Sequence, residues 1–224
     1  KTNVTLAGVG YLTGDNLQNS TSINAAGFTN FLRVDTNTKI YNLTIAGMTD
    51  YALYLTDGDK NKAWTVRHCS VNAGKIAIKH GGTGTFISHC ELSSQTEYGI
   101  YNAAANSKIF CCFILGVQAG SVGILLDYFG ASVGGTIENC TVVGQPKCIS
   151  TISNCVVKNC VAYQYTEYGF ACYDSTVSNC CAYSINEGSA ASTGDAIYSN
   201  LFEELPNFTN ADGDDYTLTP GWIG

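Results

Sequence analysis

Charge and proline are scarce in this chain. Only 13% of its 224 residues are charged, three are proline, and two, Arg33 and Arg67, are arginine. The formal net charge is −7 and no basic stripe is present, so no nucleic-acid partner is expected, because phosphate backbones need clustered Lys and Arg. No apolar run approaches the roughly 20 residues that span a bilayer, so no membrane insertion is expected.

The chain opens at Lys1 rather than at Met, and its first residues show no signal peptide. We therefore expect either a processed product or a piece of a larger chain.

A short phrase recurs along most of the sequence. An aliphatic residue is followed by any residue, usually Asn or His, then Cys, any residue and a second aliphatic residue. Self-similarity of this kind is the signature of stacked structural units. Clear copies are residues 66–71, 87–92, 109–114, 137–142 and 177–182, with shorter copies at 152–155 and 157–160 and a cysteine-free copy at 40–45.

The phrase predicts two short strands joined at a sharp corner. Its apolar residues occupy the first, fourth and sixth positions, so strict alternation slips by one residue at the third. A bend there lets all three apolar residues point inward, and Asn suits a bend because it tolerates the left-handed backbone conformation. Stacked copies would place a row of corner residues beside a row of inward cysteines. His68 and His89 take the corner position in two consecutive copies. A structural role, in which the two rings stack, is a simpler interpretation than a catalytic role.

A second phrase, in which a small residue precedes an apolar one, predicts a third strand between copies of the first. Three strands and one tight corner describe one coil of a right-handed parallel β-helix. We predict an all-β solenoid of about seven to eight such coils, with a C-terminal cap because a bare end exposes strand edges. The third-strand copies are residues 51–54, 98–101, 122–125, 168–171 and 195–198, with poorer ones at 75–78 and 147–149.

Steps between the first aliphatic positions range from 20 to 28 residues. We place Val157 rather than Ile152 in this series, although Ile152 stays open as a rival register. Ile152 would then belong to an approach strand in the same coil. A leucine-rich repeat, the rival architecture, would need an even Leu consensus, which is missing.

The two ends of the chain depart from the regular repeat. Residues 3–8 match 42–47 almost letter for letter, so residues 14–30 are expected to form a long loop in the first coil. The β-helix is expected over residues 1–185, and a linker and capping segment over 186–224. Within that segment we expect a small-residue linker at 187–194, a short helical turn at 201–206 and a closing strand at 212–221.

The eleven cysteines do not fit a metal site or a set of disulfides. Zinc sites favour two close Cys-x-x-Cys pairs, and no such quartet is present. Inward Cβ atoms on stacked strands lie about 4.8 Å apart, whereas a disulfide needs about 3.5–4.5 Å. We therefore predict reduced, buried thiols that fill a narrow core, and neither a metal nor another cofactor.

The corner phrase, seen in Asn139–Cys140, and the third-strand phrase, seen in Gly99–Ile100, resemble the right-handed parallel β-helix superfamily of pectate-lyase-like proteins. The resemblance covers residues 1 to about 185, and the tail at 214–221 looks like a common ending of such proteins. The superfamily includes pectin and alginate lyases, polygalacturonases, epimerases, phage tailspikes, adhesins and virion fibres. The resemblance thus implies the fold and leaves the function open.

Candidate catalytic residues are few. Lyases of this fold need clustered carboxylates and a base, and glycosidases need two carboxylates at a defined separation. The best candidates are Asp57, Asp59 and Arg67, although residues 57–62 are equally typical of a solvated turn. His80 faintly resembles the Gly-His-Gly stretch of polygalacturonases, but the companion motifs are missing.

Tyrosines give a second candidate site. Tyr163 and Tyr183 share a repeat position, so they are expected to stack on an outer face. Further tyrosines would extend this strip: Tyr98, Tyr165, Tyr168 and Tyr173. An aromatic strip on a polar solenoid can bind sugar rings. The simpler interpretation is that aromatic pairs stabilise the sheet by about 0.2–1 kcal/mol each.

These observations favour a structural or adhesive module of an extracellular or virion surface protein. It would present loops or the tyrosine strip to a polysaccharide or cell-surface glycan, as a homo-oligomer or as part of a larger chain. The alternative is a polysaccharide lyase or glycoside hydrolase.

Overall fold

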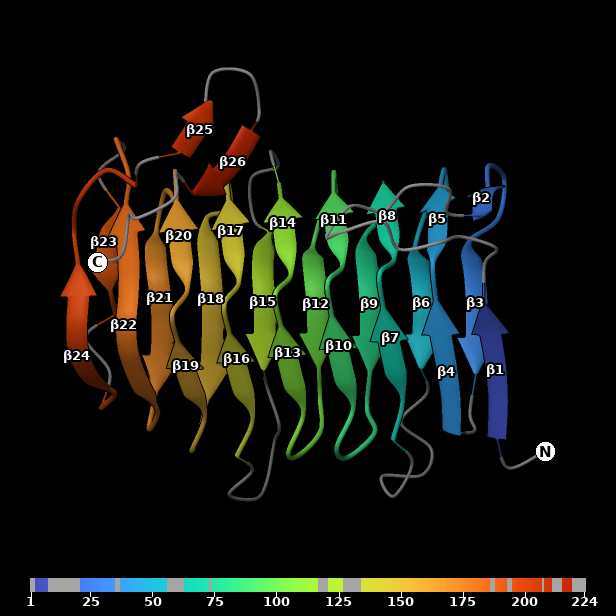
Figure 1. The fold of residues 1–224 in the computed structure, drawn as a ribbon, viewed down its shortest axis with the longest axis horizontal. Coiled ribbons are helices and arrows are strands. Elements are labelled where there is room, and N and C mark those ends of the chain that lie inside the picture. The colour runs from blue at the N-terminus through green and yellow to red at the C-terminus, as the bar shows by residue number, and fades with distance from the viewer. Residues whose placement is uncertain are drawn as a thin grey trace.

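The computed structural model is an elongated stack of coils in which short strands surround one narrow core (Figure 1). It describes residues 3–7, 21–34, 37–55, 63–72, 74–116, 121–126, 134–185, 188–192, 195–206, 208–210 and 215–218. These residues form strands and no helix, and the strands of successive coils pair in parallel through about 7 turns. The predicted all-β parallel solenoid is confirmed, while the hand of the coil and the cap stay predictions.

Each regular coil contributes one strand to each of three rows (Figure 1). The first row is β1 (Asn3–Ala7), β4 (Asn37–Tyr41), β7 (Thr65–Arg67), β10 (Phe86–Ser88), β13 (Lys108–Phe110), β16 (Thr136–Glu138) and β19 (Val156–Lys158). The second row is β2 (Thr21–Asn24), β5 (Leu43–Ala46), β8 (Ser70–Asn72), β11 (Glu91–Ser93), β14 (Phe113–Leu115), β17 (Thr141–Val143) and β20 (Val161–Tyr163). The third row is β3 (Asn30–Val34), β6 (Tyr51–Leu55), β9 (Ile76–His80), β12 (Tyr98–Asn102), β15 (Val122–Leu126), β18 (Lys147–Ile152), β21 (Tyr168–Tyr173) and β23 (Ser189–Ala191).

The strand β22 (Thr176–Tyr183) runs through both the first and the second row, since it pairs with β19 and with β20. It thereby joins the two rows into a single sheet. Three further strands, β24 (Ile197–Phe202), β25 (Phe208–Asn210) and β26 (Asp215–Leu218), follow near the C-terminus.

The corner predicted at the third position of the phrase lies between the first and second rows. Asn42 has a left-handed φ of 55°, and His68 and His89 have φ of 53° and 52° at the same place. This conformation shifts the alternation by one residue, so that the residue two positions before the corner and the residue directly after it both point inward, as Ile40 and Leu43 do. The later corner residues share it: Cys111, Asn139, Asn159, Asn179 and Asn200.

Strand pairing decides the register that the sequence left open. Val157 pairs with Ile137 in the preceding coil and with Val177 in the following one. Ile152 instead ends β18 in the third row, opposite Tyr173, and is 37% exposed. Val157 is thus the residue of the first row, and no separate approach strand exists at Ile152.

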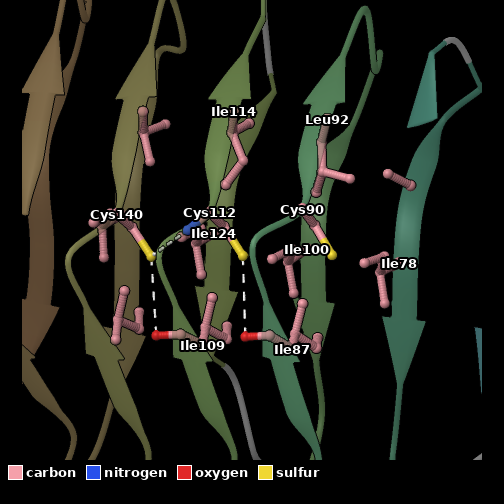
Figure 2. Close-up of a cluster of buried hydrophobic side chains, with 14 of the residues drawn as sticks. Ile78, Ile87, Cys90, Leu92, Ile100, Ile109, Cys112, Ile114, Ile124 and Cys140 are labelled. Carbon is pink, nitrogen blue, oxygen red and sulfur yellow. Dashed lines mark hydrogen bonds between the residues drawn. The ribbon is translucent and has the colours of Figure 1, made fainter. Parts of the chain in front are cut away.

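Cysteine fills the core directly behind the corner. The six cysteines that follow the corner residues are at most 2% exposed, and all eleven cysteines of the chain are free. The Sγ atoms of Cys112 and Cys140 lie 4.0 and 3.9 Å from the carbonyl oxygens of Ile87 and Ile109, one coil away (Figure 2). Burial raises the pKa of the Cys140 thiol well above its ordinary value, which keeps this side chain neutral.

Aliphatic rows complete the core on both sides of the cysteines. Figure 2 shows Ile87 and Ile109 of the first row, Leu92 and Ile114 of the second and Ile100 of the third around the same interior. Each of these side chains is at most 1% exposed. Full burial of one such side chain contributes about 1.5–3 kcal/mol, so the repeated rows supply the main stabilising contribution.

The first coil differs from the expectation. β1 pairs with β4, so that Leu6 lies opposite Ile40, and β2 pairs with β5. Residues 3–7 are therefore the counterpart of 37–41 rather than of the similar segment 42–47. Part of the expected loop at 14–30 is also wrong, because residues 21–24 form β2. The sequence similarity between the two segments was misleading here, because consecutive strands of one coil share the same alternation of inward and outward residues.

The C-terminal region also departs from the expectation. β23 and β24 continue the parallel pairing beyond residue 185, so the segment at 187–194 holds a strand. Residues 195–198 do not form a third-row strand, because Tyr198 of β24 lies opposite Val177 of β22. Residues 201–202 belong to β24, and none of the described residues 201–206 is helical. β26 pairs antiparallel with β25 to form a hairpin, which lies beside the ends of β17 and β20 in Figure 1.

Candidate functional site

The outer side of the third row carries a group of aromatic and basic side chains. In both β6 and β12 the first and fourth residues are partly buried, while the three others are buried. This pattern places Tyr51 and Tyr54 outward on one strand, and Tyr98 and Tyr101 outward two coils further on. We call the group formed by Arg33, Tyr51, Tyr54, Lys79, Tyr98 and Tyr101 the tyrosine–lysine patch.

Register explains why these side chains meet. Tyr54 of β6 pairs with Lys79 of β9, which in turn pairs with Tyr101 of β12. Arg33 of β3 pairs with Tyr54 from the other side. One row of four consecutive coils therefore presents a guanidinium, a phenol, an ammonium and a phenol.

Lys79 is the centre of the patch. Its Nζ lies 5.4, 5.1 and 5.5 Å from the ring centroids of Tyr51, Tyr54 and Tyr101. The Arg33 Cζ atom lies 5.1 Å from the Tyr54 ring. These distances are within the roughly 6 Å range in which a cation is attracted to a ring face.

The rings also contact one another. Tyr51 and Tyr54 stack with centroids 5.0 Å apart and planes inclined by 24°. Tyr98 and Tyr101 lie 5.2 Å apart with planes inclined by 60°. The contacts restrict the rings and the ammonium, so the patch is organised before any ligand arrives.

No carboxylate among the described residues neutralises the positive charge of the patch. In the part of the chain that the structure describes, neither Lys79 nor Arg33 is paired with a carboxylate. Lys75, one residue before β9, forms an ion pair with Glu97 at 3.7 Å. The patch thus offers aromatic faces and two available cations on a molecule whose formal net charge is −7.

The sequence-predicted tyrosine strip is not one surface. Tyr98 belongs to the patch, and Tyr168 occupies the same row three coils further on, beyond Val122 and Lys147. Tyr165 is 3% exposed and packs in the main core. The prediction of a continuous strip is therefore wrong, because spacing along the chain did not distinguish the rows.

Tyr163 and Tyr183 do stack, with centroids 6.2 Å apart and planes inclined by 14°. They lie outside the second row in a separate apolar cluster, where Tyr163 is only 7% exposed. Phe208 of β25 meets the Tyr163 ring edge-on at 5.0 Å. The C-terminal hairpin thus covers Tyr163, which therefore serves as a packing residue.

The sequence analysis missed Arg33, Tyr51, Tyr54, Lys79 and Tyr101. A signal was available, since Tyr-x-x-Tyr occurs at both 51–54 and 98–101. The two inward neighbours between each pair of tyrosines place both rings on the outer side.

Of the weak catalytic candidates, only Arg67 can be placed. Its Nε donates a hydrogen bond to Ser88 Oγ at 3.1 Å, and its Cζ lies 5.7 Å from the Phe86 ring. Asp57 and Asp59 lie outside the described residues. His80 is 1% exposed, and burial lowers its pKa to about 3, so it is a neutral core residue rather than an accessible base.

A hollow of about 470 Å³ lies where β18 and β21 end. Asn154, Asp174 and Asp195 are among the residues that line it. Thr176 pairs with Ile197, so Asp174 and Asp195 lie at equivalent positions of consecutive coils. Among the described residues, no group of three or more His, Cys, Asp or Glu side chains is arranged to hold a metal ion.

No protein-family model matches the chain, and no curated protein matches it either. No membrane-spanning helix is found where the structure is described. Any assignment of function therefore rests on the coil architecture and on the surface of the third row.

Proposed function

We propose that this protein is a structural, glycan-binding module of an extracellular or virion surface protein, built as a right-handed β-helix of the pectate-lyase-like kind. The tyrosine–lysine patch carries the proposal. Its rings offer apolar faces of the kind that sugar rings stack against, and they lie on a rigid sheet rather than on a loop.

The charge of the patch narrows the glycan class. Lys79 and Arg33 have no carboxylate partner within the described part of the chain, so a ligand with carboxylate or sulfate groups gains charge-assisted hydrogen bonds there. The tyrosine rings partly desolvate the Lys79 ammonium, which strengthens its attraction to an anion. The expected ligand is an acidic polysaccharide or an acidic cell-surface glycan.

A panel of acidic and neutral oligosaccharides, measured by calorimetry, tests this function. The wild-type protein is expected to bind an acidic member. Tyr54→Ala combined with Tyr101→Ala is expected to weaken binding by about fivefold or more, because two ring contacts of about 0.5–2 kcal/mol each are lost. Tyr173→Ala is the matched control, because Tyr173 is a 47% exposed tyrosine outside the patch. Equal binding by the patch and control variants would exclude the patch, and no binding to any member would overturn the proposal.

An enzyme is the second candidate, and one observation favours it. Asp174 and Asp195 line the same hollow from consecutive coils, which lie about 4.8 Å apart. Retaining glycosidases place their two carboxylates about 5–5.5 Å apart. New reducing or unsaturated sugar ends in the same panel, lost in Asp174→Asn, would replace the binding module with a hydrolase or lyase.

A further inference from the structure

The row of corner residues contains two titratable side chains side by side. His68 and His89 occupy the corner of consecutive coils, and their rings stack with centroids 4.8 Å apart and planes inclined by 28°. Asn occupies the corresponding corners at Asn139, Asn159 and Asn179. Both histidines are held in place by the backbone, because the His68 amide donates to the Ser88 carbonyl and the His89 amide to the Phe110 carbonyl, each at 3.1 Å.

The surroundings do not favour positive charge at this point. Arg67 precedes His68, and its guanidinium is directed to Ser88 Oγ rather than to a carboxylate. On the far side, the Phe110 ring meets His89 edge-on at 5.8 Å, and Cys111 is the next corner residue. The His89 Nδ1 atom is buried and has no hydrogen-bond partner among the residues that the structure describes.

Other charged groups lie on the strands around the pair. On the preceding coil, β4 provides Lys39 and Tyr41, which pair with Thr65 and Arg67. Glu91 begins β11 two residues after His89 and is exposed. In the coil beyond Phe110, Glu138 is paired with Lys158 at 3.1 Å.

We propose that the His68–His89 corner is an acid-sensitive joint, which loosens its two coils on protonation while the Asn-cornered coils remain closed. A second proton would place two imidazolium rings in stacking contact beside a guanidinium. Like charges at this distance repel, and the repulsion is stronger where the groups are partly buried. Asn at the same corner carries no charge and has no such response.

The direction in which pH changes the stability of the corner follows from the number of protons that the folded and the unfolded chain bind. Burial, then His89, then Arg67 lower the pKa of His68 below its ordinary value. Above about pH 6.5 both the folded and the unfolded chain carry neutral His68, so the corner has its full stability. As the pH falls below about 6.5, the unfolded chain binds a proton that folded His68 resists, and stability is lost until the folded-state pKa is passed.

His80 is a third histidine, and its protonation also opposes folding, because burial lowers its pKa to about 3. The dependence of the melting temperature on pH would therefore combine the contribution of His80 with that of the His68–His89 corner. The cysteines behind each corner give a local signal instead. Cys69 and Cys90 follow the histidine corners, and Cys140, Cys160 and Cys180 follow asparagine corners.

The experiment labels the intact protein with a pyridyl disulfide reagent, which reacts with thiols in acid, and identifies labelled cysteines by peptide mass spectrometry. The measured quantity is the labelling rate of Cys69 and Cys90 divided by that of Cys140 in the same sample. Between about pH 7.5 and about pH 5, this ratio is expected to rise by roughly threefold to tenfold. The internal ratio removes the effect of pH on thiol chemistry.

The paired variant His68→Asn with His89→Asn tests the cause and retains a residue that this corner accepts elsewhere. Its labelling ratio is expected to remain constant across the same pH range. A ratio that rises equally in the variant would assign the sensitivity to His80 and overturn the proposal. A constant ratio in the wild-type protein would overturn it as well, whether or not the tyrosine–lysine patch binds a glycan.

Discussion

Two groups of aromatic residues lie on the outside of this solenoid, and they differ in what covers them. The tyrosine rings of the patch on the third row are partly exposed and surround an ammonium group. The cluster around Tyr163 and Tyr183 on the second row is covered by the C-terminal hairpin through Phe208. The patch contains two cations with no carboxylate partner in the described chain, whereas the cluster is formed by apolar and aromatic side chains.

This difference separates two roles that tyrosine has in solenoids. Where the chain folds back and excludes water, the rings stabilise the fold, and no surface remains for a ligand. Where the rings stay half exposed beside a cation, their burial is incomplete and their contacts can be exchanged for those of a ligand. Mutations can therefore separate the two groups, since one should affect mainly stability and the other mainly binding.

The largest effect is expected for Tyr163→Ala. Tyr163 is 7% exposed and contacts both Tyr183 and Phe208, so truncation removes buried aromatic surface and leaves a cavity. The free energy of unfolding, measured by urea titration, should fall by about 2–4 kcal/mol. Tyr54→Ala in the patch should cost about 1 kcal/mol or less. Equal losses would show that the hairpin does not cover the second row in solution.

A second test concerns β15, the third-row strand that follows the patch strand β12. A Cβ atom at Gly123 of β15 would clash with Val142 Cγ1 and lie 2.6 Å from the Cys148 carbonyl oxygen. Gly123→Ala should therefore destabilise the fold by about 1–3 kcal/mol through overpacking. At Gly134 the nearest atom is 3.4 Å away, which is an ordinary contact, so Gly134→Ala is the control. Similar melting temperatures for the two variants would contradict this close approach between rows.

A third test concerns the corner between the first and second rows. Asn139 has a left-handed φ of 55°, a conformation that costs Ala roughly 1–2 kcal/mol. Asn139→Ala should lower the free energy of unfolding by about that amount, whereas Ser178→Ala, on the outward side of β22, should change it by about 0.5 kcal/mol or less. Unfolding of both variants at the same denaturant concentration would contradict the role of Asn139 as the corner residue.

The coil could be predicted from the sequence because its rules are local. A left-handed corner at Asn or His, an inward Cys and aliphatic residues on both sides follow from backbone conformation and burial alone. The ends were harder to predict. Residues 3–7 resemble 42–47 yet pair with 37–41, because short strands with the same alternation differ only in their long-range partners.

The candidate site was harder still. Tyr165 and Tyr168 are three positions apart in the sequence, yet Tyr165 enters the core and Tyr168 lies on the third row. The side to which a tyrosine points depends on where each coil turns, and coil lengths here vary with the insertions. Lys79 lacks any sequence feature that marks it. Its role appears only when Tyr54 and Tyr101 are placed on either side of it by the pairing of β6, β9 and β12.

The smallest change in stability, and the clearest separation of the two groups, is expected for Lys79→Met. Methionine matches the apolar stem of lysine as far as Cε but removes the ammonium group from the three tyrosine rings. Cation–π contacts at partly exposed sites contribute about 0.5–1 kcal/mol, so the free energy of unfolding should fall by no more than about that amount. Binding to the acidic oligosaccharide should weaken by about tenfold to hundredfold, because a charge-assisted contact contributes about 1.5–3 kcal/mol. Lys108→Met is the matched control, since Lys108 begins β13 in the first row, away from the patch. If Lys79→Met and Lys108→Met bind the glycan equally well, the ammonium group has no part in recognition, and only the aromatic rings remain as the binding surface.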